Sequence, residues 1–414
     1  MTPPAAAAPA TRALAPAILA LALGHVFSNA VRTLPAVAAD LLERDLGLAA
    51  DELAAITGIF PLAFAAAMVP VGVALDRYGV KPVALILLAI ASAGAAAAAL
   101  APGPLGMALA QAVLGIGCSG MLMGPMTFAA KALPPARFAL WSGLIQTTGN
   151  TGMLLSASPL AWLVEAAGWR AGYAVAAAFA VLAALLVAAI VRERPPRPRD
   201  PAPSAWTDAR EVVALGLSRR LRAPVVLALA SFAAVLGVRG LWGGPWLMEV
   251  KGMPRIAAGN LLLFCTLALT LGPTLAGWLA RQAGGRERTL LAGGHLAAAG
   301  LLALLLLGGP GGPFGAFPAA LDAALLAAFG LAIGFQVLAF PMVRAAVVPE
   351  QTGRALSAMN IAYFGGAAAL QAVSGAAAAA GGAGAAIASF VLALVLCTAA
   401  FLMLSRPSNE GTHR

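Results

Sequence analysis

The chain has 414 residues, of which 61% are hydrophobic and only 10% charged, and its mean hydropathy is +0.90. Because soluble domains carry about 25% charged residues, this composition excludes a water-soluble fold. The formal net charge of +10 is concentrated in alternating loops between apolar stretches, so it indicates membrane topology and argues against a nucleic-acid partner.

Twelve apolar stretches are each long enough to cross about 30 Å of hydrocarbon, which takes about 20 helical residues. They cover residues 13–38, 51–74, 82–102, 104–130, 139–164, 170–192, 223–248, 256–281, 288–308, 319–343, 354–379 and 383–405. The sequence therefore predicts an all-α membrane protein with twelve transmembrane helices. Cys118, Cys265 and Cys397 lie inside these stretches, so no disulfide framework, metal site or other cofactor is expected.

Basic residues are concentrated on one side of the predicted membrane. That side holds Arg12, Arg77, Lys81, Lys131, Arg137, the Arg192–Arg222 stretch, Arg281–Arg288, Arg344, Arg354 and Arg406. The opposite loops hold acidic residues, namely Asp40, Glu43, Asp45, Asp51, Glu52, Glu165 and Glu249. By the positive-inside rule, both termini are expected in the cytoplasm, with the chain in a bacterial-type inner (plasma) membrane.

The first predicted helix carries a polar stripe of His25, Ser28, Asn29 and Arg32. Spacings of three, four and seven residues place all four on one helical face. An ionisable group inside a span costs about 2.5 to 3.5 kcal/mol or more, so it normally faces a cavity or a partner. We interpret the stripe as a substrate-binding wall on which Arg32 holds an anion; the alternative is that Arg32 extends outward to the acidic residues after the helix.

The loop after the second predicted helix reads PVGVALDRYGVKP. Its glycines permit close packing, and an acid flanked by bases can form a charge interaction at a helix end. Gly72, Asp76, Arg77, Gly79 and Lys81 resemble the motif G-x-x-x-D-R-x-G-x-[RK] of the major facilitator superfamily, in the loop where that family carries it. In the family this loop is expected to act in conformational change.

The fifth predicted helix contains GLIQTTGNTGMLLSASPLAWLVEAAGWR, which resembles the glycine-rich, proline-bearing fifth helix of the superfamily. GNTG at 149–152 is also similar to part of the nitrate/nitrite porter signature. Those porters carry anion-binding arginines on helices 2 and 8, where this chain has none within the span, so nitrate is not favoured. Helix packing is the commoner role of such glycines, and Gln146 and Asn150, one turn apart, are the candidate substrate-binding groups.

The longest polar segment contains RERPPRPRDPAPS, whose prolines and charges cannot continue a membrane helix. It divides the chain into an N-terminal six-helix bundle (1–192), a cytoplasmic linker (193–222) and a C-terminal six-helix bundle (223–414). The resemblance to the superfamily implies two halves related by an axis along the membrane normal, a central cavity and alternating access. We expect a monomer that binds one small-molecule substrate.

The seventh predicted helix carries Arg239. The string PTLAGWLARQAGGR after helix 8 aligns with the first loop motif, with Arg281 where Asp76 would stand. The same offset aligns Arg32 with Gly237, which lies two residues before Arg239. Two arginines at similar depth would repel unless an anion bridged them, and their planar donors suit carboxylate or phosphate. This arrangement resembles that of organophosphate:phosphate antiporters and implies an anionic organic substrate.

Further candidate substrate-binding groups lie on helices 7, 10 and 11. Trp242 lies near the outer end of helix 7, where tryptophan usually anchors a helix at the membrane interface; a wall or gate over the substrate is the alternative. Gln336 and Asn360 are candidates for hydrogen bonds to substrate, although bonds between helices, worth about 0.6 kcal/mol each, explain such residues equally well.

Coupling is predicted from the buried titratable groups. Proton-coupled carriers commonly use a buried carboxylate, but Asp40, Glu249 and Asp322 all lie at the ends of predicted spans. His25 lies deep in its span and changes charge near neutral pH. Proton coupling through His25 and exchange of one anion for another both stay open.

The sequence thus predicts a secondary active transporter of a small organic anion. No paired acids, metal-ligand cluster, nucleophile elbow or phosphate-binding loop occurs in the sequence, so an enzyme is not expected. Two alternatives stay open: proton-coupled efflux of hydrophobic drugs, and a transporter-like sensor that moves no solute.

Overall fold

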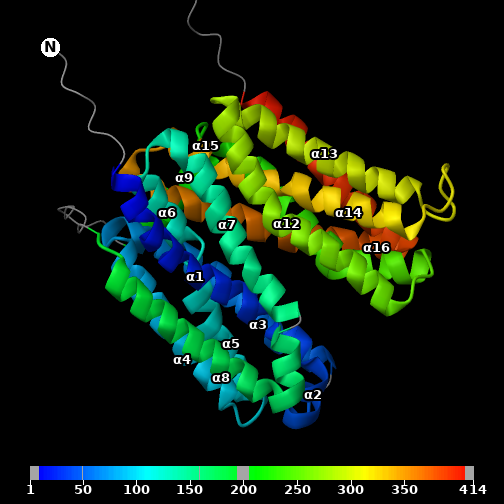
Figure 1. Ribbon diagram of the computed structural model, residues 1–414, viewed down its shortest axis with the longest axis horizontal. Coiled ribbons are helices and arrows are strands. Elements are labelled where there is room, and N and C mark those ends of the chain that lie inside the picture. The colour runs from blue at the N-terminus through cyan, green and yellow to red at the C-terminus, as the bar shows by residue number, and fades with distance from the viewer. Residues whose placement is uncertain (1–8, 49, 158, 194–204, 406–414) are drawn as a thin grey trace, which may run out of the picture. The chain divides into compact units, whose positions relative to one another are not determined.

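The computed structural model describes residues 9–48, 50–157, 159–193 and 205–405, and the regular secondary structure within these ranges is helical. The chain divides into two compact units (Figure 1). The first contains the residues up to Arg210 together with Val348–Ser357, and the second contains Glu211–Val347 and the residues from Ala358 onward. The division falls inside the predicted linker 193–222, and the predicted limits of the two bundles stay predictions.

The first unit is built around eight helices. They are α1 (Pro9–Val37), α2 (Ala39–Leu46), α3 (Ala50–Arg77), α4 (Val80–Ala99), α5 (Pro104–Cys118), α6 (Met123–Ala132), α7 (Pro135–Ala157) and α8 (Pro159–Ile190). α8 consists of two helical segments that meet at Gly168, whose φ of 79° breaks the regular winding. α1 packs mainly on α7 and α8, while α4 packs on α5 and α8.

The second unit begins within α9 (Ala205–Leu217). Its other segments are α10 (Arg222–Leu236), η1 (Gly237–Trp242), α11 (Gly243–Pro245), η2 (Trp246–Val250), α12 (Arg255–Ala283), α13 (Glu287–Leu307), α14 (Ala319–Ile333), η3 (Gly334–Leu338), α15 (Ala339–Ala346), η4 (Pro349–Gln351) and α16 (Thr352–Leu404). The short segment η4 and the first residues of α16 group with the first unit. η1 and η2 are π-helical turns, so the seventh predicted helix is wound irregularly around Arg239 and Trp242.

The helices agree with the predicted number of crossings. Ten stretches of the described chain are long and apolar enough to span a membrane. The longest, Pro349–Leu404, holds two predicted crossings, because the backbone of α16 is non-helical at Gly381 and Gly382. α7, with the start of α8 after it, corresponds to the fifth predicted crossing. The predicted all-α membrane fold is confirmed.

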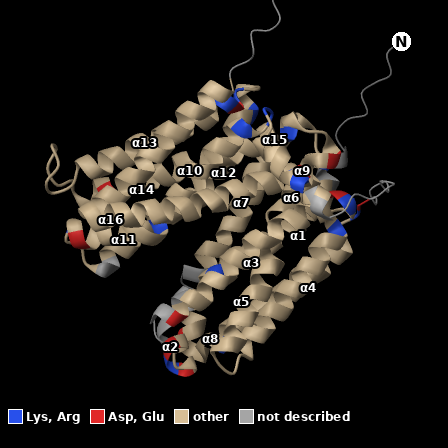
Figure 2. Ribbon diagram, turned by 180° about the vertical axis from the view of Figure 1, so that it is seen from behind, with Lys and Arg blue, Asp and Glu red and all other residues tan. Residues whose placement is uncertain are grey.

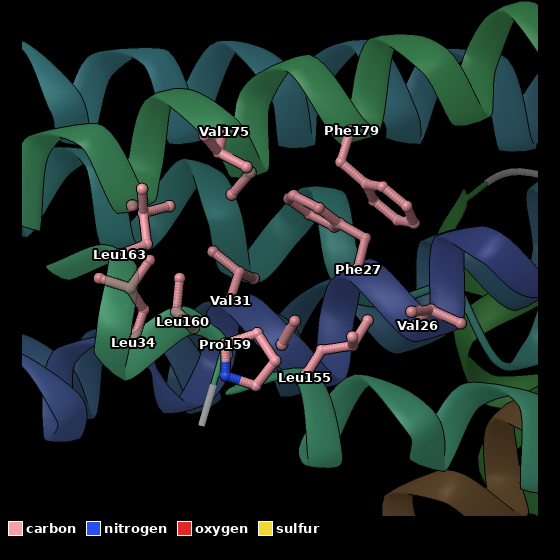
Figure 3. A pocket seen from close by; sticks show the side chains of 13 residues that line it. Val26, Phe27, Val31, Leu34, Leu155, Pro159, Leu160, Leu163, Val175 and Phe179 are labelled. Carbon is pink, nitrogen blue, oxygen red and sulfur yellow. The ribbon is translucent and has the colours of Figure 1, made fainter. Parts of the chain in front are cut away.

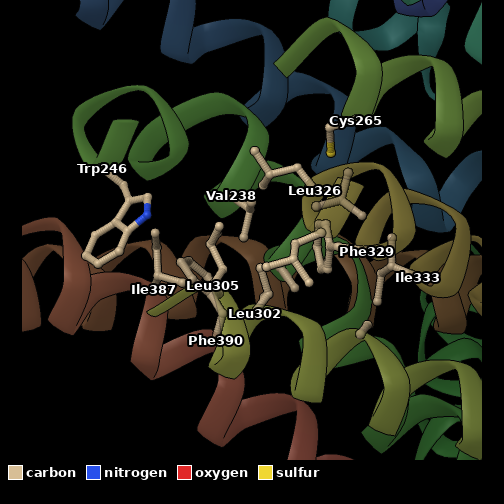
Figure 4. Packing of buried hydrophobic residues seen from close by; sticks show 14 of the residues in the cluster. Val238, Trp246, Cys265, Leu302, Leu305, Leu326, Phe329, Ile333, Ile387 and Phe390 are labelled. Carbon is tan, nitrogen blue, oxygen red and sulfur yellow. The ribbon is translucent and has the colours of Figure 1, made fainter. Parts of the chain in front are cut away.

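Close packing of small residues holds the helices together, because lipid supplies no hydrophobic drive for one helix to leave it for another. In the first unit, a Cβ atom on Gly117 of α5 would lie 2.5 Å from the backbone nitrogen of Ala91 in α4. In the second unit, a buried cluster joins α13, α14 and the later part of α16 around Leu302, Phe329 and Phe390 (Figure 4).

Charged residues are mostly found at the ends of the helices within each unit, and the helix middles are largely uncharged (Figure 2). The short helix α2 shows the pattern. Arg44 and Trp169 both donate hydrogen bonds to the carboxylate of Asp45, at 2.9 and 3.0 Å. These bonds, that of Arg44 first, lower the pKa of Asp45, and the bond from Trp169 attaches α2 to α8.

Replacing Gly117 by alanine tests the packing argument. The added methyl group meets the backbone of α4, so we expect a loss of about 1 to 3 kcal/mol from overpacking and a lower melting temperature in detergent. Gly300→Ala in α13 is the matched control, because nothing lies within 4 Å of its Cβ position and alanine favours a helix by about 0.5 to 1 kcal/mol. Equal melting temperatures for the two variants would contradict the close contact.

Candidate functional site

Polar residues predicted on helices 1 and 5 lie together inside the first unit. Asn29 Nδ2 lies 3.5 Å from His25 Nε2 and donates to the backbone carbonyl of Gly149 at 2.9 Å. Gln146 Nε2 lies 3.4 Å from His25 Nε2 and donates to Asn150 Oδ1 at 3.1 Å. We call His25, Asn29, Gln146 and Asn150 the amide–histidine cluster. It connects α1 to α7 through side chains that are separated by more than one hundred residues in sequence.

The cluster depends on the absence of a side chain at Gly149. A Cβ atom there would overlap the imidazole of His25, and a Cβ atom on Gly152 would overlap the carbonyl oxygen of Val26. The GNTG string therefore brings α7 against the backbone of α1 while leaving room for one imidazole ring. Packing and placement of polar groups are two consequences of the same glycines.

The direction of the hydrogen bonds at His25 Nε2 depends on the tautomer of the imidazole. The amide nitrogen of Asn29 faces the carbonyl oxygen of Gly149, since the amide oxygen would be repelled there. The amide nitrogens of Asn29 and Gln146 both lie near His25 Nε2, and they donate to it in the neutral tautomer whose proton lies on Nδ1. Protonation of Nε2 would require the amides of Asn29 and Gln146 to rearrange.

Arg32 lies one turn beyond Ser28 on α1 and is half-buried. Its Nη2 donates to Ser28 Oγ at 3.4 Å. The guanidinium carbon lies 5.4 Å from the ring centroid of Phe64 and 5.8 Å from that of Phe60, both on α3. A cation over an aromatic face is attracted by the ring quadrupole, so the two aromatic rings of α3 stabilise the charge of Arg32.

In the second unit, the side chain of Arg239 extends from η1 and contacts α12. Its Nε donates to Thr266 Oγ1 at 2.8 Å, and the hydroxyl of Thr266 donates to the carbonyl of Leu262 at 2.8 Å. Trp242, also in η1, donates from Nε1 to Ser374 Oγ of α16 at 3.0 Å. Arg32 in the first predicted crossing thus contacts the second, and Arg239 in the seventh contacts the eighth.

The predicted residues on helices 10 and 11 are less closely connected. Gln336 is half-buried in η3, and its backbone carbonyl accepts a hydrogen bond from the hydroxyl of Tyr363 at 3.2 Å. Asn360 is buried on α16, 3% exposed. The ring of Tyr363 contacts Phe232 and Phe340. Tyr363 therefore packs in a cluster of aromatic rings, which the sequence did not predict.

The loop motif forms a charge network inside the first unit. Asp76 Oδ1 accepts from Lys131 Nζ at 3.2 Å and from the backbone N–H of Gly353 at 2.9 Å. Its Oδ2 accepts from the backbone N–H of Arg354 at 3.0 Å, and Arg354 Nη1 lies 3.5 Å away. Asp76 thus caps the positive end of α16. Gly72 leaves room for this approach, because a Cβ there would lie 2.5 Å from Ser357 Cβ.

The remaining motif residues shape the start of α4. Gly79 adopts a φ of 89°, a left-handed conformation that favours glycine. The backbone N–H of Lys81 donates to Glu193 Oε2 at 2.8 Å, and Lys81 Nζ donates to the carbonyl of Ala188 at 2.8 Å. Glu193, at the end of the sixth crossing, therefore caps α4. Arg77, the last residue of α3, is half-buried.

A cavity of about 220 Å³ lies in the first unit among α1, α7 and α8 (Figure 3). Apolar side chains line it, among them Phe27, Leu34, Leu155 and Phe179. These residues occupy a different face of α1 from the predicted stripe. The cavity has no group to bind a charged solute, and it is separate from the amide–histidine cluster.

The second unit contains a buried ion pair that the sequence did not predict. Lys251 Nζ lies 2.9 Å from Asp322 Oδ2, with the two side chains 2% and 0% exposed. The same ammonium donates to the carbonyls of Gly308 and Phe317 at 2.8 and 3.1 Å. Asp322 does lie in the first turn of α14, as a predicted span end. No sequence pattern indicated that Lys251, at the end of the seventh crossing, would be its partner.

Metal binding is not indicated by this arrangement. Among the residues that the structure describes, no group of three or more His, Cys, Asp and Glu side chains is gathered as a metal site requires. The site offers guanidinium, amide, imidazole and hydroxyl groups. Groups of these kinds can bind and orient a solute, and a guanidinium attracts a negative charge.

The sequence profile of the Major Facilitator Superfamily matches residues 21–370. The chain belongs to this superfamily. The match includes the loop motif and both arginines. The chain is thus a multi-pass membrane protein of a superfamily of transporters, as the sequence predicted.

Relatives with assigned names are distant and matched in part. The chain is 25% identical over 250 residues to a putative niacin/nicotinamide transporter of Bacillus subtilis (strain 168), covering 59% of this chain and 60% of the relative. It is 24% identical over 279 residues to the hexuronate transporter of the same strain, covering 65% and 63%. It is 26% identical over 159 residues to a probable sulfoacetate transporter of Cupriavidus necator, covering 38% and 37%. The chain thus matches less than two thirds of each relative's length.

Solved transporters share the fold over nearly the whole chain. The E. coli fucose:proton symporter FucP superposes with a TM-score of 0.77 at 15% identity, covering 95% of this chain and 100% of that chain. The proton:xylose symporter XylE superposes with a TM-score of 0.73 at 14% identity, covering 95% and 96%. At such identities the likeness concerns the fold alone.

The Lys251–Asp322 pair is tested by comparing a variant that removes one charge with a variant that removes both. Asp322→Asn leaves a buried ammonium without its counter-charge, which costs about 3 to 5 kcal/mol, so we expect a much lower melting temperature in detergent. The double variant Lys251→Met, Asp322→Leu removes both charges and should recover most of that loss. A double variant that melts no higher than Asp322→Asn would show that the charges are not coupled.

Proposed function

We propose that this transporter carries a small organic anion, bearing a carboxylate or a phosphate ester, by alternating access. The observation that carries the proposal is Arg32. Its guanidinium lies within the first helix bundle, against the rings of Phe60 and Phe64. Arg32 is on the same face of α1 as the His25 and Asn29 of the amide–histidine cluster. Placing a positive charge there is costly, and an anionic solute would offset that cost.

Arg239 supports the same substrate class from the second unit. It lies two residues from the position aligned with Arg32, and like Arg32 it is half-buried. A planar guanidinium binds carboxylate or phosphate with two parallel hydrogen bonds. We infer that each of the two arginines contributes positive charge to substrate binding, and that the amides of Gln146 and Asn150, with Trp242, Gln336 and Asn360, bind other parts of the substrate.

The names of the relatives agree with this class. Hexuronate and sulfoacetate each carry a carboxylate at neutral pH, and the name of the third relative pairs niacin, a carboxylate, with nicotinamide, its uncharged amide. That shared group is what an arginine recognises. We therefore favour a carboxylate over a phosphate ester.

Coupling and topology are part of the same proposal. Proton uptake by His25 would break its contacts with Asn29 and Gln146, which would link protonation to the shape of the cluster; exchange for another anion is the alternative. Basic loops on one side support cytoplasmic termini in a bacterial-type inner membrane. We expect the transporter to work as a monomer.

The substrate class is tested with matched pairs of ligands. We would measure thermal stabilisation and uptake into proteoliposomes with nicotinate, glucuronate and sulfoacetate, using nicotinamide and glucose as uncharged counterparts of the first two. Wild-type protein should respond to at least one anion and not to its uncharged counterpart. Loss of a charged hydrogen bond costs about 1.5 to 3 kcal/mol, so Arg32→Ala and Arg239→Ala should each weaken binding at least tenfold.

The control variant is Arg219→Ala, which removes an exposed arginine and should leave binding unchanged. Stabilisation by hydrophobic cations that survives both site variants would refute the anion proposal and favour drug efflux. Ligand binding without any uptake or exchange would instead favour a sensor.

Proton coupling is tested by the pH profile of uptake. If His25 carries the coupling proton, His25→Gln should abolish acceleration of uptake by an imposed pH gradient, while exchange of internal for external anion continues. The measurement is initial uptake with and without the gradient. A variant that keeps the full gradient response would exclude His25 and leave anion exchange as the mechanism to test.

A further inference from the structure

The direction of the hydrogen bonds around Arg239 is fixed by chemistry. A threonine hydroxyl has one proton, and Thr266 donates it to the carbonyl of Leu262 in the preceding turn of α12. Its oxygen is therefore left as an acceptor, and Arg239 Nε donates to that oxygen at 2.8 Å. Thr266 is 4% exposed, so water does not compete for this bond.

The bond involves one end of the guanidinium and leaves the other end open. Arginine has five N–H donors, one on Nε and four on the two Nη atoms. For Arg239, the hydrogen bond to Thr266 through Nε is the one that the described residues provide. The two Nη atoms form the edge that binds a carboxylate in a two-point contact.

We propose that Thr266 is a positioning residue: it holds Arg239 by Nε so that both Nη atoms are presented to the substrate carboxylate. This inference rests on the proposed function. Arg239 lies in a π-helical turn, whose backbone is less regular than an α-helix. A side-chain anchor on the regular helix α12 compensates by fixing the guanidinium plane. Pre-organisation of this kind lowers the entropy lost on binding.

Thr270 provides a matched control one turn along the same helix. It is also 4% exposed, and its hydroxyl donates to the carbonyl of Thr266 at 2.8 Å. Its position in α12 is thus equivalent, but this hydroxyl bond goes to the helix backbone and not to Arg239. Valine has nearly the shape of threonine without the hydroxyl, so Thr266→Val and Thr270→Val remove the same group from the same kind of site.

The experiment compares Thr266→Val, Thr266→Ser, Thr270→Val and Arg239→Ala in the full-length protein. We would measure KM and kcat for uptake of whichever of nicotinate, glucuronate and sulfoacetate stabilises the wild type most, and the melting temperature without ligand. Thr266→Val should raise KM about 2- to 12-fold, the cost of ordering one flexible side chain on binding. Thr266→Ser should restore KM, and Thr270→Val should leave it within twofold of the wild type.

The outcomes separate this inference from the proposed function. If Arg239→Ala weakens anion binding but Thr266→Val does not, the positioning role is refuted and the function stands. If both valine variants raise KM equally and melt at equally lowered temperatures, Thr266 has a structural role only and the inference is refuted. If Arg239→Ala binds all three anions like the wild type, the part of the proposed function assigned to Arg239 fails, and the role of Thr266 fails with it.

Discussion

Lipid offers no hydrogen-bond partner to a polar group, and the organisation of this protein depends on that constraint. Every backbone N–H and C=O in a crossing must be satisfied within the protein, which leaves helices as the way for this chain to span the bilayer. Side chains obey the same rule. His295 is completely buried and bonds both the carbonyl of Leu291 at 2.8 Å and Ser231 Oγ at 2.7 Å. Polar residues are tolerated where a specific neighbour satisfies their hydrogen bonds.

Helix packing and site construction are therefore the same problem in this molecule. The approach of α1 to α7 requires glycine at positions 149 and 152, and that approach brings the amide–histidine cluster together. Bulkier residues would separate the helices and leave the imidazole and amides without partners. Such close contacts are the principal source of stability between membrane helices, so the positions of the polar groups are fixed with the same precision as the packing.

The half-buried arginines of the two units make different contacts. In the first, Arg32 rests on the rings of Phe60 and Phe64, which attract the cation through its charge. In the second, Arg239 gives one donor to a threonine hydroxyl. Both arrangements are compatible with a ligand at the guanidinium. They differ in rigidity, because a short hydrogen bond restricts the guanidinium plane more than an aromatic surface does.

Much of the architecture could be predicted from the sequence. The length of the apolar stretches, the alternation of basic and acidic loops and the motif around Asp76 determined a membrane transporter of this superfamily, because the thickness of hydrocarbon and the cost of burying charge act on each segment separately. Helical periodicity also placed His25, Asn29 and Arg32 on one face.

What only the tertiary structure decided is which residues are neighbours across helices. Asp76 accepts a hydrogen bond from Gly353, 277 residues later in the first turn of α16. Lys251 pairs with Asp322, and Arg239 bonds Thr266. Periodicity identifies the face on which a side chain lies, but not the element that the face meets. That choice depends on how closely the small residues let all the helices approach one another. No single segment of the sequence contains this information.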